Sequence, residues 1–174
     1  AEAAEELKSD REIVLAAGQN GGAMTLLFAA EESKFDREIV LAAVESDGGA
    51  LEYAADELKA DREIVLAAVQ QDLSALRYAS DELTSDREFM MPLVETNPLA
   101  LQYFPDELKA DREIVLAAVK CNGWALECAD DEFRSDRELV LIAVREDCEK
   151  IEMASDKLKS DREFMLEAVQ VDGR

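Results

Sequence analysis

Acidic and basic side chains recur along this chain in a fixed order, as seven Asp-Arg-Glu triplets. The triplets begin at Asp10, Asp36, Asp61, Asp86, Asp111, Asp136 and Asp161. A row of such carboxylates could bind cations or a basic peptide through charge. The alternative is structural, with each Asp capping a helix and each Glu lying in its first turn. Each Arg would then pair with the carboxylates that precede a triplet in an adjoining repeat, such as Asp56 and Glu57. We favour the structural interpretation, because residues present in every repeat serve what every repeat needs.

The residue types that commonly perform catalysis or bind metals are scarce. The chain has no histidine, and its three cysteines, Cys121, Cys128 and Cys148, follow no zinc-binding spacing. No cysteine is placed distinctively beside a base. The segment 45–48 is the nearest approach to a calcium loop, and it lacks the required ligand spacing. The sequence therefore predicts a protein that is not an enzyme and has neither a metal nor a cofactor.

The charge of the chain limits its partners. The formal net charge is −22, from 41 acidic and 19 basic residues. Such a field repels nucleic acid and anionic lipid, so we expect no nucleic-acid partner, whereas a protein with a basic surface is compatible. No apolar run has the length of a transmembrane helix, so no membrane insertion is expected. Cysteines without a disulfide pattern favour an intracellular reducing compartment, and an organelle is compatible with this.

The spacing of the triplets predicts the architecture. It is 26 residues once and then 25 residues five times, which is typical of a repeat array. We predict an all-α fold, an α-solenoid of about seven 25-residue helical-hairpin repeats that forms one array over residues 1–174. Both ends fall inside a repeat, so the sequence is expected to be a fragment of a longer array.

The first half of each repeat is predicted to be a long helix. In the repeat that begins at Asp61, residues 64–69 are apolar around the whole helical circumference, as in a helix buried between neighbours. The helix begins at the triplet. Its cap is either the Asp itself or a preceding Ser, as in a capping box formed by Ser85 and Glu88.

Prolines mark the second half of the repeat, because proline favours the first turn of a helix. Asn97 is expected to cap a short helix that begins at Pro98 and ends near Phe104. Pro105 is expected to open a separate helical turn over residues 106–109. Each repeat is thus predicted to be a long helix, a tight turn, a short helix and a further helical turn.

The repeated motif D-R-E-x-V-L-x-A-V … N-G-x-A-L-x-Y-A extends over essentially the whole chain, and residues 111–126 fit it best. It is similar to a helical repeat family of unknown function that occurs as long arrays in algae, other protists and some bacteria. The resemblance implies a helical repeat. It brings no activity and no catalytic or ligand-binding residues.

Positions that vary between repeats are the candidates for partner binding. Counted from the Asp of each triplet, these are columns 10, 11, 14 and 17. Trp124, the only Trp, lies in column 14, where it could anchor an interface or pack on its own turn. The predicted partner-binding residues are Trp124, Leu99, Arg77, Gln102 and Glu127.

The repeat that begins at Asp86 departs from the pattern in a second way. Pro92 falls inside its long helix, where it removes a hydrogen bond and is predicted to kink the helix. The irregularity could produce a bend in the array or a docking patch, or it could be sequence drift.

These observations predict a non-enzymatic protein–protein interaction scaffold. The alternative is an accessory or linker subunit held permanently in a larger complex, for which an organellar, algal setting is compatible. An enzyme would need a cleft with converging polar groups, which a regular array lacks. A designed consensus array is disfavoured by the scattered cysteines, Pro92 and the single 26-residue spacing.

Overall fold

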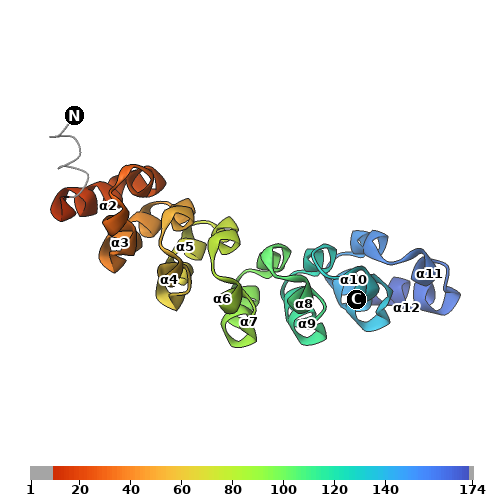
Figure 1. Cartoon of the computed structure of the whole chain (residues 1–174). Coiled ribbons are helices and arrows are strands. Elements are labelled where there is room, and N and C mark those ends of the chain that lie inside the picture. Colours follow the sequence, from red (N-terminus) through yellow and green to blue (C-terminus); the bar gives the residue numbers. More distant parts are fainter. Residues whose placement is uncertain (1–9, 173–174) are drawn as a thin grey trace. The chain divides into compact units, whose positions relative to one another are not determined.

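The computed structural model describes residues 10–172, and these residues form helices and no strand. The all-α repeat fold predicted from the sequence is confirmed. Contacts between residues divide the chain into two compact units, with the boundary between Thr84 and Ser85. Within each unit the long helices of successive repeats pack side by side, and so do the short helices that follow them (Figure 1).

Each of the five repeats that begin at Asp36, Asp61, Asp86, Asp111 and Asp136 contains three helical segments. The long helices are α2 (Arg11–Phe28), α3 (Arg37–Ser46), α5 (Arg62–Gln71), α7 (Arg87–Thr96), α9 (Arg112–Cys121), α10 (Arg137–Glu146) and α12 (Arg162–Asp172). The second segments are 3₁₀ helices: η2 (Gly48–Tyr53), η3 (Leu73–Tyr78), η4 (Pro98–Tyr103), η5 (Gly123–Glu127) and η7 (Cys148–Met153). The third segments are η1 (Glu31–Phe35), α4 (Asp56–Lys59), α6 (Asp81–Thr84), α8 (Asp106–Lys109), η6 (Asp131–Ser135) and α11 (Asp156–Lys159).

The Asp of each triplet caps its own long helix. In α5, Asp61 Oδ1 accepts hydrogen bonds from the backbone N–H groups of Glu63 at 2.9 Å and Ile64 at 3.2 Å. The predicted Ser85–Glu88 capping box is wrong, because Asp86 is the residue whose side chain accepts from the first turn of α7. The Asp side chain accepts hydrogen bonds from two N–H groups that would otherwise lack a partner, and this fixes the start of every long helix.

In four repeats the Arg of the triplet pairs with the next triplet, and the predicted pairing with residues such as Asp56 is wrong. Arg37 donates from Nε to Asp61 at 2.9 Å and from Nη2 to Glu63. Asp56 instead lies 3.6 Å from Lys59 of its own turn. Arg is the first residue of its helix, so its guanidinium reaches the start of the neighbouring long helix. The same pairing recurs for Arg11, Arg87 and Arg112.

The core lies between the long helices and the 3₁₀ helices of adjacent repeats. Ile64, Val65 and Ala68 of α5 are fully buried, and so is Ala75 of η3. Equivalent positions in other repeats are also buried, which explains why this part of the repeat varies so little. Burial of these apolar side chains stabilises each repeat against its neighbours.

The second half of the repeat follows the prolines as predicted, with one exception. η4 begins at Pro98 and α8 follows Pro105, but the side chain of Asn97 makes no capping hydrogen bond. In the other 3₁₀ segments that follow a long helix, an Asp or Asn side chain does accept from the N–H two residues on, as Asn122 does from Trp124 at 3.0 Å.

The first repeat of the described chain, which has the extra residue, turns at a glycine. Gly22 interrupts α2 with φ 44° and ψ −125°. A Cβ atom at this position would lie 2.3 Å from the Cβ of Asp47, so no other residue fits without displacement of the backbone.

Pro92 does not interrupt its helix. α7 is ten residues long, as are α3, α5, α9 and α10, and the side chain of Pro92 is exposed. The hydroxyl of Thr96 donates to the carbonyl of Pro92 at 2.9 Å. The predicted kink at Pro92 stays a prediction.

Removal of one Asp cap tests the role of the triplet in stability. We expect Asp111→Ala to lower the free energy of unfolding by about 1 kcal/mol, because the N–H groups of Glu113 and Ile114 lose their acceptor. Asp111→Asn keeps the acceptor and weakens only the pairing with Arg87, so it should cost less. Urea denaturation followed by circular dichroism measures both variants. Equal losses would contradict the capping role.

The Arg–Asp pairing also predicts a pH dependence. The Arg37 guanidinium holds the pKa of Asp61 below its ordinary value of 3.8. A lowered pKa in the folded state contributes stability above pH 3.8, and this contribution disappears as the pH falls through the folded value. Arg37→Gln should therefore make the free energy of unfolding less dependent on pH below about 4. Lys157→Gln, which removes an exposed cation elsewhere, is the matched control and should leave the slope unchanged.

Candidate functional site

A groove with both apolar and charged walls lies on the long helices of the second unit. Its volume is about 1020 Å³, and we call it the α10 groove. It is lined by Lys120, Asp136, Arg137, Glu138, Leu141, Ile142, Arg145, Glu146 and Glu167. Lys120 comes from α9, Glu167 from α12, and all the others from α10 or its N-cap. The groove thus exists only where three successive repeats are stacked.

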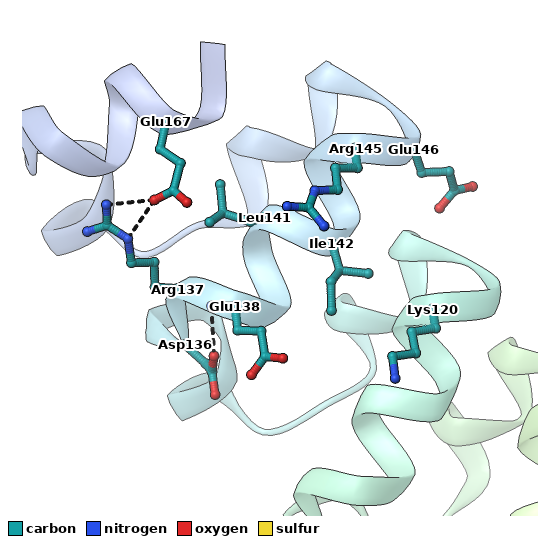
Figure 2. A pocket seen from close by; sticks show the side chains of 9 residues that line it. All are labelled: Lys120, Asp136, Arg137, Glu138, Leu141, Ile142, Arg145, Glu146 and Glu167. Atoms are coloured by element: carbon teal, nitrogen blue, oxygen red, sulfur yellow. Dashed lines mark hydrogen bonds and ion pairs between the residues drawn. The ribbon is translucent and has the colours of Figure 1, made fainter. Parts of the chain in front are cut away.

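The apolar surface of the groove comes from the middle of α10 (Figure 2). Leu141 is buried and Ile142 is half-buried. Ile142 occupies column 7, where other repeats carry Ala42, Ala67, Pro92, Ala117 and Glu167. A large aliphatic side chain at this position is therefore peculiar to α10. It lies one helical turn before Arg145, so the two side chains are neighbours on the helix surface.

Every carboxylate that lines the groove has a cationic partner. Arg112 donates to Asp136 at 3.0 Å and to Glu138 at 2.5 Å, as the triplet pattern requires. Arg137 departs from that pattern. It donates to Glu167 at 3.0 and 2.7 Å, whereas Asp161 lies 3.9 Å away.

Glu146 belongs to a second cluster, beside the groove, that includes the only Trp. Lys150 is only 2% exposed, and its Nζ lies 2.8 Å from Glu146 Oε2. The same carboxylate accepts from the Gly123 N–H at 2.5 Å. The Lys150 Nζ also lies 5.8 Å from the centre of the Trp124 ring, within range of a cation–π interaction. We call Gly123, Trp124, Glu146 and Lys150 the Trp124 cluster.

The Trp124 cluster places a buried charge where the four preceding repeats have alanine. Lys150 is in column 15, which in those repeats holds Ala50, Ala75, Ala100 and Ala125, all fully buried. A Cβ atom at Gly123 would lie 2.8 Å from the Lys150 Cδ, so glycine makes room for the lysine. The Lys150 ammonium and then the Gly123 N–H hold the pKa of Glu146 below its ordinary value of 4.5. The cluster therefore fixes the end of α10 against η5.

The five residues predicted to bind partners all lie on 3₁₀ helices and are all exposed. Arg77 is in η3 of the first unit, whereas Leu99 and Gln102 are in η4 and Trp124 and Glu127 are in η5. Gln102 donates its side-chain amide to the Leu99 carbonyl at 3.1 Å. Trp124 is 45% exposed and also contacts Lys150, so it both packs and presents surface.

Sequence reasoning found some of the groove columns and missed others. Column 10, which contains Lys120 and Arg145, was already recognisable as variable. Ile142 and Glu167 interrupt a column that is otherwise Ala or Pro, and Lys150 interrupts an alanine column. These three departures were visible in the aligned repeats. Their meeting in space was not, because it depends on which column of one helix faces which column of the next.

Other kinds of site find little support in the part of the chain that the structure describes. Between residues 10 and 172, no group of three or more Cys, Asp or Glu side chains is placed to hold a metal ion. Cys121 and Cys148 are exposed. The pKa of Cys128 is raised, mainly because the thiol is partly buried and also because the Glu127 carboxylate is near. No helix in this range is both long enough and apolar enough to span a membrane.

Comparison with known proteins identifies the repeat. The family model described as "Domain of unknown function (DUF4116)" matches residues 36–84, 86–134 and 136–174. The chain belongs to this family. The predicted resemblance to a repeat family of unknown function is thereby confirmed. Each complete DUF4116 match begins at a triplet Asp and covers two 25-residue repeats, so the structural period is half the family unit. No curated protein and no solved structure matched the chain.

The fluorescence of Trp124 reports on its cluster, because no other Trp is present. Lys150→Ala removes the side chain that lies against the ring, so we expect red-shifted emission and stronger quenching by acrylamide. Lys150→Met keeps an unbranched stem, so its spectrum should remain close to that of the parent chain. Glu146→Gln leaves the buried ammonium without its carboxylate and should lower the free energy of unfolding by about 1–3 kcal/mol. An unchanged spectrum in Lys150→Ala would show that the ring does not lie on Lys150.

Proposed function

We propose that this DUF4116 chain is a non-enzymatic scaffold that binds a segment of a partner protein in the α10 groove. The observation that carries the proposal is the groove itself, which combines about 1020 Å³ of volume with the aliphatic surface of Leu141 and Ile142. Binding sites are typically concave, with an apolar surface and charged groups that orient the ligand. The α10 groove combines the aliphatic wall of Leu141 and Ile142 with seven charged side chains.

The repeat pattern supports the assignment of binding to the groove and not to the triplets. The triplet side chains already cap helices and pair with the next repeat, as Arg112 does with Asp136 and Glu138. The hydrogen-bonding groups of these side chains are therefore already used to hold the repeats together. Ile142, by contrast, lies at a column where the repeat requires only a small residue. A side chain that stacking does not require is available for another role.

The partner as a whole is proposed to carry a basic surface, because the chain has a net charge of −22. Long-range attraction of opposite charges speeds association and orients the partner before contact. The 3₁₀ side of the second unit is a further proposed contact region. Leu99 and Trp124 expose apolar surface there, at 40% and 45%. Gln102 and Glu127 would add polar contacts there. Arg77, in η3 of the first unit, is proposed as a separate contact of that unit.

Selection from an unbiased peptide library tests whether the α10 groove binds protein segments. The immobilised chain is used to select from a random-peptide phage library, and the enriched peptides are synthesised with a fluorophore. We expect Ile142→Gln to weaken their binding at least about tenfold in fluorescence anisotropy, since it places a polar group on the apolar wall. The control is Ala67→Gln, which introduces the same residue at the same column of α5 in the first unit. It should leave the affinity unchanged.

The same peptides separate the two proposed surfaces. Leu99→Ala and Trp124→Ala remove apolar contacts on the 3₁₀ side and leave the groove wall intact. If these variants weaken binding whereas Ile142→Gln does not, the 3₁₀ side is the binding face and the groove assignment is wrong. If no peptide is enriched over a surface without protein, the proposal of peptide-segment binding is overturned.

A further inference from the structure

Two cations line the α10 groove at a column that is elsewhere acidic or neutral. Lys120 and Arg145 occupy column 10 of α9 and α10. The other long helices α3, α5, α7 and α12 carry Glu45, Gln70, Glu95 and Gln170 at this column. Because α9 and α10 contact each other, the two cations lie on neighbouring helices, whose axes are about 8–10 Å apart.

Neither cation has a protein partner within the described range. Between residues 10 and 172, Lys120 and Arg145 form no ion pair and no hydrogen bond through their side chains, although both line the groove. The carboxylates nearest to them are already engaged: Glu138 by Arg112, Glu146 by Lys150 and Glu167 by Arg137. The charges of Lys120 and Arg145 therefore remain available to a ligand.

The groove is close to neutral, although the chain is strongly acidic. The cations that line the groove or pair with its lining are Arg112, Lys120, Arg137, Arg145 and Lys150, and the carboxylates are Asp136, Glu138, Glu146, Asp161 and Glu167. These five cations and five carboxylates balance, and Lys120 and Arg145 are the two cations of this set without a carboxylate partner. At physiological ionic strength, charges more than about 8 Å away are largely screened, so these two unpaired cations govern a ligand in contact.

Ile142 lies between the two cations. In Figure 2 it projects between Arg145 and Lys120, and Leu141 lies on the other side of Arg145, toward Glu167. A segment that follows the groove would thus meet a cation, an aliphatic surface and a second cation. Aliphatic side chains of a ligand suit Ile142, and carboxylates suit the two cations, with Arg145 able to bind a carboxylate through two N–H groups.

We propose that the segment held in the α10 groove is acidic, with one or two Asp or Glu side chains next to an aliphatic residue. This inference rests on the proposed function and defines the ligand of that same site. The partner protein carries its basic surface elsewhere, against the acidic remainder of the chain. The segment itself carries the opposite charge. Binding then depends on Lys120 and Arg145 in addition to Ile142.

The composition of the peptides selected from the unbiased library is the first readout. We expect enrichment of Asp or Glu beside Leu, Ile or Val. In one enriched peptide, replacement of each acidic residue by its amide should weaken binding at least about tenfold. Lys120→Gln and Arg145→Gln should weaken binding of the acidic peptide to a similar extent, and have little effect on its amide form. In a double-mutant cycle, such non-additivity between the loss of a cation in the protein and the loss of a carboxylate in the peptide identifies a direct charge contact.

Controls separate charge contact from damage to the fold. Lys157→Gln removes an exposed cation on α11, outside the groove, and should leave affinity unchanged. Lys120→Arg keeps the charge and should restore most of the binding. Because the contact is ionic, affinity for the acidic peptide should also fall as salt is added, whereas affinity for the amide form should not.

The outcomes distinguish this inference from the proposed function. Peptides that are basic or neutral, yet lose binding with Ile142→Gln, would overturn the acidic ligand and leave the groove as the binding site. Peptides whose affinity is unchanged by Ile142→Gln would overturn both the groove as binding site and the acidic ligand. Sedimentation of the chain alone tests a second copy as the occupant. If it dimerises and Ile142→Gln makes it monomeric, the groove holds another copy and the inference of an acidic partner segment is wrong.

Discussion

One carboxylate per repeat holds the architecture together, because it serves two helices at once. Asp136 accepts from the N–H groups of Glu138 and Leu139 in its own helix and from the guanidinium of Arg112 in the preceding repeat. The first contact starts the helix, and the second sets its position relative to its neighbour. Exposed ion pairs contribute little stability singly. Their value here is geometric, since the pairs Arg11–Asp36, Arg37–Asp61, Arg87–Asp111 and Arg112–Asp136 each set the register of one repeat against the next within a unit.

This division of labour decides where function can reside. A column that caps, pairs or fills the core in every repeat cannot change without loss of stacking. The columns left over are those of the exposed faces, and α10 collects several unusual residues there, among them Ile142 and Arg145. Glu167 draws Arg137 away from the regular ladder, and Lys150 anchors Glu146 at the other end of the helix. Ile142, Arg145, Lys150 and Glu167 thus form one neighbourhood around α10.

Much of the fold could be read from the sequence, and most of the candidate site could not. The 25-residue period, the apolar stretch 64–69 and the positions of Pro98 and Pro105 predicted three helical segments per repeat, as observed. The partner of each Arg was predicted wrongly. The alignment of the repeats in sequence does not say whether Arg37 contacts Asp61 itself or the carboxylates that precede Asp61. The groove requires side chains from α9, α10 and α12 together. Periodicity aligns such residues in columns, but it does not say which columns face each other.

The acidity of the chain has a different meaning once the pairing is known. A net charge of −22 suggests a uniform acidic surface, yet the carboxylates of each triplet are largely engaged by helix N–H groups and by guanidinium groups. Where all nearby carboxylates are paired, two additional cations keep their charges available to an anionic group, as Lys120 and Arg145 do. Net charge then governs how a partner approaches over long distances, and the unpaired side chains govern what it places in contact. A strongly acidic repeat can for this reason present a binding groove that favours an acidic segment.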